Sequence, residues 1–334
     1  MTLVLAGDIG GTKVNIGIFS LQARRPRLRI MKSYRSRNFP SLKSILEQFL
    51  STHSLRPACA SFAVAGPVIH GKCITTNLPW VLEEALLQNF LSVDHVSLIN
   101  DLAATAYAVP VLRSSELVTL NRGVRRRGHI GVIAAGTGLG EAFLYWDGMS
   151  YHPMSTEGGH VDFAPTSLLE LELWQWMRLR QQHVSVEKIL SGGGLVSIYE
   201  FFKSREKGAE PLALARAPSG EKARVISELA LRAENRVCAK ALDLFVSIYG
   251  AEAGNVALQG MTIGGVYLGG GIAPKILEWL KKETFMKAFT DKGRFSVFLS
   301  QIPVKVILNE RTALLGAALY GLRVAGLLPK HVAP

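Results

Sequence analysis

Residues 3–19 read LVLAGDIGGTKVNIGIF, two apolar runs joined by a polar turn that contains a pair of glycines. Runs of this length and composition predict buried β-strands, here over residues 3–6 and 14–19. Residues 130–146, IGVIAAGTGLGEAFLYW, repeat the same order of strand, glycine turn and strand. This repetition predicts two related lobes that face one cleft.

Segments typical of strands and helices alternate along the rest of the chain. Further strands are expected over residues 60–65, 96–99, 266–268 and 304–307. The spacing of apolar residues predicts helices over residues 42–50, 82–91, 102–109, 168–180, 186–203, 221–249 and 313–322. Alternation of this kind is typical of an α/β protein whose sheets are mostly parallel and covered by helices.

The composition excludes several classes of protein. Of the 334 residues, 48% are hydrophobic and only 19% are charged, which excludes a disordered or coiled-coil chain and suits two lobes. The apolar run at the N-terminus is too short for a signal peptide, and no stretch reaches the ~18 apolar residues of a membrane span. Cys59, Cys73 and Cys238 lie far apart and support neither a disulfide framework nor a zinc site. We therefore expect a soluble, cytoplasmic protein with no membrane partner.

The net charge of +12 raises nucleic acid as a partner, and the basic residues form two clusters. The first cluster comprises Arg24, Arg25, Arg27, Arg29, Lys32, Arg35 and Arg37, and the second comprises Arg122, Arg125, Arg126 and Arg127. The first suits a hairpin and its exposed strand, and the second suits a loop between two strands. Neither has interleaved aromatic residues or a recognised nucleic-acid module around it. Solvated surface loops, with no nucleic-acid partner, are the favoured interpretation.

Glycine-rich turns at strand ends are candidate phosphate sites, because backbone N–H groups can converge on an anion where no Cβ intervenes. The first turn adds the Thr12 hydroxyl, the Lys13 amine and the Asp8 carboxylate, which suits a Mg²⁺ ion bound through water. It lacks the Walker A pattern, and one such turn is equally well an ordinary tight turn. Three glycine-rich strand ends, at residues 10–11, 136–140 and 269–271, favour a nucleotide cleft.

Seven segments carry a resemblance to a known family. They are GDIGGT (7–12), TTNLPW (75–80), LINDLAATAYAVP (98–110), AAGTGLGEAFL (134–144), EGGHVDFAP (157–165), HVSVEKILSGGGL (183–195) and GGVYLGGGIAP (264–274). In these segments the chain resembles bacterial glucokinases of the hexokinase and actin-like ATPase superfamily. It lacks the cysteine-rich zinc motif that the related ROK kinases carry after the EGGH-like segment, which favours the non-ROK group. It departs from the family at Lys13, where Asn is frequent.

The resemblance implies a fold and an activity. The fold is the two-lobed actin-like ATPase (ribonuclease H-like) fold, α/β, with mixed sheets covered by helices and a cleft between the lobes. Residues 1–110 with 308–334 form the small lobe, and residues 111–307 form the large lobe. The activity is that of a glucokinase, which transfers the γ-phosphoryl group of ATP, with Mg²⁺, to the 6-hydroxyl of glucose. The family also suggests a homodimer.

The resemblance further assigns residues to roles. Asp101 resembles the general base that takes the proton of the sugar 6-hydroxyl. The implied sugar ligands are Asn77, Asn100, Asp101, Glu157, His160 and Glu187. The implied ATP-binding residues are Asp8, Gly10, Gly11, Thr12, Lys13, Thr137, Gly138, Gly270 and Gly271, with Asp8 also holding Mg²⁺ through water.

Other interpretations stay open at this point. Asp101 also suits a helix N-cap, and Glu187 suits an acid in the first turn of a helix over 186–203. Glu157, His160 and Asp162 form a weak candidate metal site. The same ligand types bind other hexoses, and a sugar-sensing regulator would bind without phosphorylating. Such regulators carry an N-terminal DNA-binding domain, for which a phosphate turn that starts at Gly7 leaves no room.

Overall fold

The structure is a computed structural model that describes residues 2–22, 25–53, 55–75, 77–206 and 209–328. The chain divides into two compact units. Unit 1 comprises residues 1–114, 142–155 and 309–334, and unit 2 comprises residues 115–141 and 156–308. The predicted α/β class with mixed, helix-covered sheets is confirmed. The division differs from the predicted lobes by placing residues 142–155 with the terminal segments, and the functional lobes stay a prediction.

A five-stranded mixed sheet forms the centre of unit 1, in the order β3-β2-β1-β4-β7. The strands β1 (Leu3–Ile9), β2 (Lys13–Gln22) and β3 (Arg25–Arg35) are successively antiparallel. The strands β4 (Cys59–Val64) and β7 (Val96–Asn100) continue the sheet in parallel with β1. Because Ile9 pairs with Val64 and Val64 pairs with Asn100, the carboxyl ends of β1, β4 and β7 meet at one edge of the sheet.

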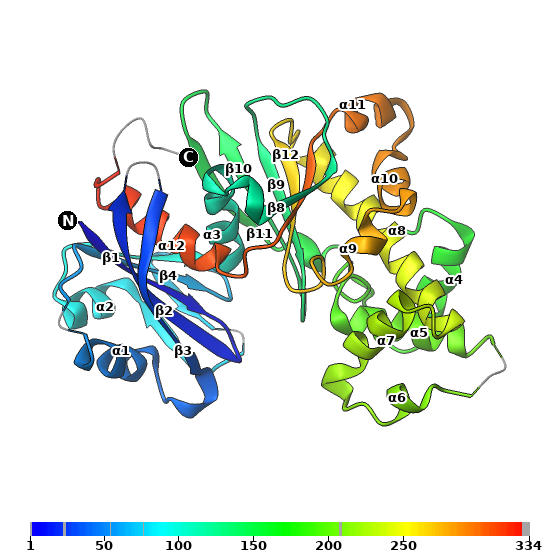
Figure 1. The fold of residues 1–334 in the computed structure, drawn as a ribbon, viewed down its shortest axis with the longest axis horizontal. Helices are drawn as coiled ribbons and strands as arrows, with labels where there is room; N and C mark the ends of the chain where they lie inside the picture. Colours follow the sequence, from blue (N-terminus) through cyan, green and yellow to red (C-terminus); the bar gives the residue numbers. More distant parts are fainter. Residues whose placement is uncertain (1, 23–24, 54, 76, 207–208, 329–334) are drawn as a thin grey trace. The chain divides into compact units, whose positions relative to one another are not determined.

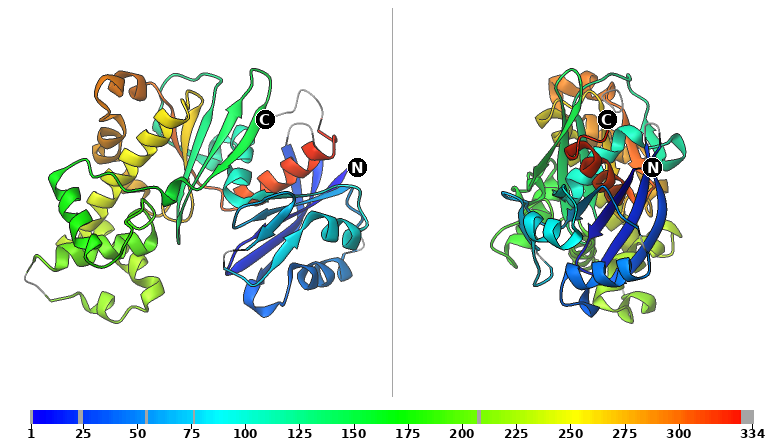
Figure 2. Two further views of the ribbon diagram at one scale, coloured as in Figure 1. Left: turned by 180° about the vertical axis from the view of Figure 1, so that it is seen from behind. Right: turned by 90° about the vertical axis from the view of Figure 1, so that its left-hand side faces the viewer.

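Helices cover both faces of this sheet. The apolar sides of α1 (Leu42–Ser51) and α2 (Glu84–Leu91) pack with alternate residues of the strands into one core cluster. The helices α3 (Asp101–Ala108) and α12 (Thr312–Val324) lie together on the opposite face (Figures 1 and 2). Gly316 of α12 lies so close to the Ala104 carbonyl of α3 that a Cβ would overlap it. A hairpin of β5 (Lys72–Ile74) and β6 (Val81–Glu83) precedes α2.

The second large sheet has six strands in the order β11-β10-β9-β12-β13-β8. Its central strands β9 (Ile130–Ala135), β12 (Gly265–Gly269) and β13 (Val304–Ile307) are parallel, and β8 (Leu117–Asn121) is antiparallel to β13. The strands β10 (Leu139–Trp146) and β11 (Tyr151–Thr156) extend the other side. The boundary between the two units falls within β10.

Unit 2 is otherwise helical, and its longest helix is buried. That helix, α8 (Arg236–Gln259), packs against α5, α7 and α10 and against strands β9 and β12 (Figure 1). The other helices are α4 (Leu168–Arg178), α5 (Gly192–Lys203), α6 (Leu212–Ala215), α7 (Lys222–Leu231), α9 (Leu277–Leu280), α10 (Glu283–Thr290) and α11 (Ser296–Ser300). A face of α8 that would otherwise expose small and apolar residues is thus enclosed by its neighbours.

Two helix predictions are wrong. The helix expected over residues 186–203 begins only at Gly192, because Val186 N bonds to Val161 O (3.0 Å) and Glu187 N bonds to Gly159 O (2.8 Å) instead of forming a helical turn. The helix expected over residues 221–249 is divided into α7 and α8. Ala233 adopts a positive φ of 55°, and the Asn235 side chain caps a new helix by accepting from Cys238 N.

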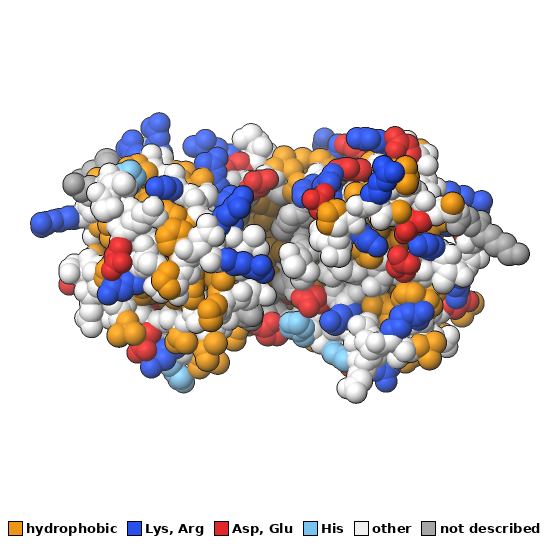
Figure 3. Space-filling view, turned by 90° about the horizontal axis from the view of Figure 1, so that it is seen from below, with side chains coloured by type: hydrophobic (Ala, Val, Ile, Leu, Met, Phe, Trp, Pro, Cys, Tyr) orange, Lys and Arg blue, Asp and Glu red, His pale blue; other side chains and the backbone are white. Residues whose placement is uncertain are grey.

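The two basic clusters lie on a hairpin strand and a loop, as expected from the sequence. Arg24 lies outside the described residues, and β3 carries the other members up to Arg35. The residues 122–127 are all exposed between β8 and β9. On the face drawn in Figure 3, Lys and Arg side chains alternate with acidic and apolar ones. The absence of a nucleic-acid partner stays a prediction. Among the described residues, no helix is both long and apolar enough to cross a bilayer.

Candidate active site

The first glycine turn joins β1 to β2 and is held by hydrogen bonds from within and from outside. Gly10 N donates to Lys13 O at 3.0 Å and so closes the turn. Ser36, which is fully buried, donates from Oγ to Gly10 O (2.7 Å) and from N to Thr12 O (3.1 Å). The side chains of Thr12 and Lys13 are exposed, as phosphate-binding groups must be.

Asn77, a predicted sugar ligand, lies against this same turn. A Cβ on Gly11 would lie only 2.5 Å from the Cβ of Asn77. No side chain can be added at Gly11 unless Asn77 moves, so glycine is required here for close approach rather than for flexibility. The structure therefore brings a predicted phosphate residue and a predicted sugar ligand into contact within unit 1.

Asp8 lies on β1 opposite Asn15 and is the candidate Mg²⁺ ligand. Asn15 Nδ2 donates to Asp8 Oδ2 at 3.2 Å, and Ser33 Oγ in turn donates to Asn15 Oδ1 at 2.7 Å. Burial raises the pKa of Asp8, although the Asn15 hydrogen bond and the charge of Lys13 act in the opposite direction. A carboxylate that has lost water in this way gains most from a nearby cation. One carboxylate fits Mg²⁺, which binds one or two carboxylates together with water and substrate phosphates.

Asn100 and Asp101 lie at the carboxyl end of β7, at the sheet edge where β1 and β4 also end. Asn100 is the N-cap of α3, because its Oδ1 accepts from Leu102 N (3.0 Å) and Ala103 N (3.1 Å). Its Nδ2 donates to Gly66 O at 3.3 Å. The N-cap interpretation of Asp101 is therefore wrong, since Asp101 is the first residue of the helix itself.

The carboxylate of Asp101 is oriented by the start of α3. Leu102 N donates to Asp101 Oδ1 at 2.9 Å, and the side chain is half-buried. The positive end of the helix dipole stabilises a negative charge at this position. The pKa of the buried Cys73 thiol is raised, chiefly because the thiol is buried and to a lesser extent because the Asp101 carboxylate is near. The Asn100 amide is largely used for capping, so direct sugar binding would rely on its one remaining Nδ2 hydrogen.

The second glycine turn joins β9 to β10 in unit 2. Gly136 N donates to Gly138 O at 2.8 Å, and Gly192 N, at the start of α5, donates to Gly136 O at 2.9 Å. Leu139 N donates to Glu187 Oε2 at 3.0 Å. A Cβ on Gly138 would overlap the Glu187 carboxyl group, so this turn lies directly on a carboxylate. The Thr137 side chain at its tip is exposed.

Glu157, His160 and Glu187, three predicted sugar ligands, converge in unit 2. Glu157 and His160 flank Gly158 and Gly159 in a short 3₁₀ turn. His160 Nε2 lies 3.8 Å from Glu157 Oε2, and His160 Nδ1 lies 4.0 Å from Glu187 Oε1. The side chains of Glu157 and His160 are 65% and 59% exposed, so a ligand can reach them. Glu187 precedes α5, so its interpretation as a first-turn helix acid is wrong.

The third glycine-rich strand end follows β12. Gly270 has a positive φ of 77°, and a Cβ there would overlap the Ala135 carbonyl at the end of β9. Ile272 N donates to the same carbonyl at 3.2 Å. Gly270 and Gly271 are exposed, and nothing lies within 4 Å of a Cβ built on Gly271. The carboxyl ends of the parallel strands β9 and β12 thus place Thr137, Gly138 and Gly270 at one edge of the sheet.

The metal interpretation of Glu157, His160 and Asp162 has no support. Asp162 Oδ1 instead pairs with His183 Nε2 at 2.9 Å. In the part of the chain that the structure describes, no group of three His, Cys, Asp or Glu side chains is placed to hold a metal ion.

Two residues that support the glycine turns, Ser36 and Gly192, are not among the residues predicted from the sequence. Ser36 lies 26 residues from Gly10, and no local motif points to their contact. Gly192 did have a signal, because Ser191 before three glycines is typical of a helix N-cap, and the Ser191 side chain accepts from Gly194 N.

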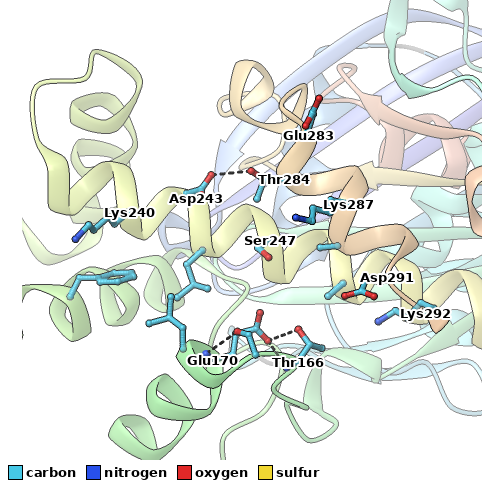
Figure 4. Close-up of a pocket in the computed structure, with 16 residues that line it drawn as sticks. Thr166, Glu170, Lys240, Asp243, Ser247, Glu283, Thr284, Lys287, Asp291 and Lys292 are labelled. Atoms are coloured by element: carbon cyan, nitrogen blue, oxygen red, sulfur yellow. Dashed lines mark hydrogen bonds between the residues drawn. The ribbon is translucent and has the colours of Figure 1, made fainter. Parts of the chain in front are cut away.

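A large cavity lies elsewhere in unit 2, between α4, α8 and α10 (Figure 4). Its volume is about 780 Å³, and Lys240, Asp243, Ser247, Lys287 and Lys292 are among the residues that line it. None of the predicted site residues lines it. Cations and carboxylates alternate around its wall, so the cavity has no strong preference for a ligand of one charge.

Comparison with known proteins identifies relatives over nearly the full length. A family model described as Glucokinase matches residues 5–323. The glucokinase of Nostoc sp. (strain PCC 7120) is 40% identical, over 97% of this chain and 100% of that protein. The crystal structure of a glucokinase from an Antarctic psychrotroph matches with a TM-score of 0.86 and 31% identity, over 97% of this chain and 99% of that one. A ROK family glucokinase from Streptomyces griseus, solved with glucose and AMPPNP, has 18% identity and a TM-score of 0.66 and shares the fold. The predicted two-lobed actin-like ATPase fold is confirmed.

Proposed function

The chain belongs to the glucokinase family, and on that basis we propose that it transfers the γ-phosphoryl group of ATP to the 6-hydroxyl of glucose, giving glucose 6-phosphate and ADP. The observation that carries the proposal is the common edge of β1, β4 and β7. The glycine turn at residues 10–13 follows β1, and Asp101 follows β7, so both lie at the same end of three parallel strands, with β4 between them. Phosphoryl transfer needs both a phosphate cradle and a base for the attacking hydroxyl.

In this mechanism Asp101 is the general base. Its Oδ1 is fixed by Leu102 N, and the N-terminus of α3 stabilises the ionised carboxylate. The carboxylate takes the proton of the sugar 6-hydroxyl as that oxygen bonds to the γ-phosphorus. The bond from the γ-phosphorus to the bridging oxygen breaks, and its electron pair leaves with ADP.

Glucose binding is assigned to carboxylate, imidazole and amide side chains. Glu157, His160 and Glu187 converge around one short turn in unit 2, where the two carboxylates offer charged acceptors for neighbouring hydroxyls and the His160 ring adds a further polar group. Asn77 and Asn100 serve on unit 1, where Asn77 contacts Gly11 and Asn100 caps α3. A site that pairs sugar hydroxyls with fixed acceptors rejects analogues that lack those hydroxyls.

ATP binding is assigned to the three glycine-rich strand ends. Gly10, Gly11, Thr12 and Lys13 in unit 1, and Thr137 and Gly138 in unit 2, are assigned to the phosphates. Gly270 and Gly271, which are exposed, serve next to adenosine. Bound Mg²⁺ would neutralise phosphate charge, and Asp8 would hold it, in part through water.

This function can be tested by measuring sugar phosphate formed from a panel of hexoses, with ATP or polyphosphate as the donor, and by measuring ADP release in a coupled assay when ATP is used. We expect glucose and ATP to give the highest kcat/KM. A higher value with mannose, fructose or an amino sugar would assign the enzyme to another hexose. Glucose binding by calorimetry without ADP release from any hexose would instead indicate a sugar sensor.

We also propose that the enzyme works in the cytoplasm as a homodimer. ATP and free hexoses occur together in that compartment, and the family resemblance favours the dimer. Sedimentation velocity tests the assembly, because a monomer across the micromolar range would contradict it.

A further inference from the structure

Two buried carboxyl groups of unit 2 have no part in the proposed chemistry. Glu141 on β10 is 2% exposed, and Glu252 on α8 is 7% exposed. The two carboxyl groups lie close enough to shift each other's pKa, and the buried Glu141 Oε1 has no hydrogen-bond partner among the described residues. Glu252 Oε2 also accepts from Asn255 Nδ2 at 2.9 Å. An ionised carboxylate is solely an acceptor, so two buried carboxyl groups can lie side by side without repulsion only when one of them carries a proton.

Burial favours the neutral form of both carboxyl groups. Desolvation and then the neighbouring Glu252 raise the pKa of Glu141 to about 8. Desolvation also raises the pKa of Glu252, while the bonds from Asn255 and Glu141 lower it. The pair therefore carries a proton near neutral pH, and that proton belongs to the pair rather than to one of its two carboxyl groups.

Glu141 lies directly beneath the turn that carries two of the proposed sugar ligands. Gly158 approaches the Glu141 carboxyl so closely that a Cβ would overlap Oε2. Thr156 Oγ1 donates to Glu141 O at 3.0 Å and accepts from Gly158 N at 3.1 Å. Both the side chain and the backbone of Glu141 thus contact the turn from which Glu157 and His160 project.

The other titratable groups near the pair are few. Tyr249 of α8 is buried, and the Glu141 charge contributes to the raised pKa of its hydroxyl. Lys292 (Figure 4) lies near Glu252, Asp291 and Glu170, and burial lowers the pKa of its amine. Lys292 lowers the pKa of Glu252 but is not among the causes that act on Glu141. Titration of Glu141 is therefore governed by the pair itself.

We propose that Glu141 is a positioning residue: buried beside Glu252 and packed against Gly158, it holds the turn at residues 158–160 in the form that presents Glu157 and His160 to the sugar, as long as the buried pair keeps its proton. The proposal rests on the proposed glucokinase function. Loss of the proton places two negative charges against each other in a dry site, and the shift this causes passes to Gly158 and the residues beside it.

The expected effect is a loss of sugar affinity at alkaline pH. A raised pKa means that the folded protein binds a proton that the unfolded chain releases, so this contribution to stability is lost as the pH rises from about 4.5 to about 8. If only the protonated form binds glucose well, the apparent KM rises about tenfold between pH 7 and pH 9. The value of kcat should change much less, because Asp101 lies in another unit.

The test compares wild type with Glu141→Gln, which keeps a neutral donor at every pH. We expect KM for glucose, and the glucose dissociation constant measured by calorimetry without ATP, to stay within about twofold from pH 7 to pH 9 in the variant. Glu170→Gln is the matched control. Glu170 is also buried, at 3% exposure, but it accepts from Thr166 N and Oγ1 and does not contact the turn. The KM for glucose of Glu170→Gln should rise with pH as it does in wild type.

The possible outcomes separate a failure of the Glu141 proposal from a failure of the proposed function. If KM for glucose rises with pH as steeply in Glu141→Gln as in wild type, the proposal is overturned. If Glu141→Gln does not fold, Glu252→Gln replaces it: removal of the neighbouring charge should move the rise in KM to lower pH, and an unmoved rise would again overturn the proposal. A wild-type protein that forms no ADP with any hexose would contradict the proposed function instead.

Discussion

The two glycine turns have similar sequences but different supports. The first, at residues 10–12, is braced by a neutral side chain, because Ser36 donates to the carbonyl of Gly10. The second, at residues 136–138, is braced by a carboxylate, because Glu187 accepts from Leu139 N and lies directly under Gly138. Glu187 Oε1 also lies 4.0 Å from Nδ1 of His160, another of the proposed sugar ligands. Under the proposed roles, the first turn meets a sugar ligand where Asn77 packs against Gly11, whereas the second turn is joined to the proposed sugar ligands by the Glu187 carboxylate itself.

The largest effect is expected at the edge that the first turn shares with Asp101. Asp101→Asn keeps the size of the side chain but removes the base, so kcat should fall by about 10²- to 10⁴-fold. Glucose binding measured by calorimetry should be nearly unchanged, since an amide keeps the hydrogen-bonding groups. Near-normal turnover would contradict the role of Asp101.

A matched pair of variants in the second turn tests whether the carboxylate support matters. Gly138→Ala places a methyl group against Glu187, whereas nothing lies within 4 Å of a Cβ on Gly136. We expect Gly138→Ala to lower kcat/KM for both substrates by about 10- to 100-fold and Gly136→Ala to stay within about twofold. Equal effects would show that this turn has no special contact with Glu187.

Glu187 itself should affect both substrates. Glu187→Gln removes the charge but keeps an acceptor for Leu139 N, so we expect KM for glucose to rise about tenfold and KM for ATP about threefold. Glu172→Gln is a suitable control, because Glu172 is an exposed partner of Arg205 on the outside of α4. A change in the KM for glucose alone would remove the proposed link between the second turn and the sugar ligands.

The smallest effect is expected for the neutral support of the first turn. Ser36→Ala removes the bond to Gly10 O, so we expect a loss of about 1 kcal/mol in the free energy of unfolding and a two- to threefold rise in KM for ATP. KM for glucose should not change. The control is Ser51→Ala, an exposed serine at the end of α1. A larger effect on glucose than on ATP would show that the first turn also serves the sugar.

Candidate site residues could be proposed from the sequence where the segments that carry them are local. The glycine turn before Lys13 and the Asn100-Asp101 pair follow apolar strands, and strand ends at one sheet edge are where α/β proteins place their sites. The start of α5 was missed because residues 186 and 187 bond to residues 161 and 159, and tertiary pairing overrode a helical periodicity. The contact of Glu141 with Glu252 joins residues 111 positions apart, and neither lies in a motif that names the other.

The position of α12 near the end of the chain affects how unit 1 folds during synthesis. It covers one face of the unit 1 sheet and contacts α3 at Gly316, yet residues 115–308 separate it from most of that unit. A ribosome that has completed every residue of unit 2 has not yet supplied the helix that buries the first strands. During synthesis the strands of unit 1 therefore lack this helix and leave apolar surface exposed, while unit 2 can already fold. We expect chaperone binding to matter most in this interval.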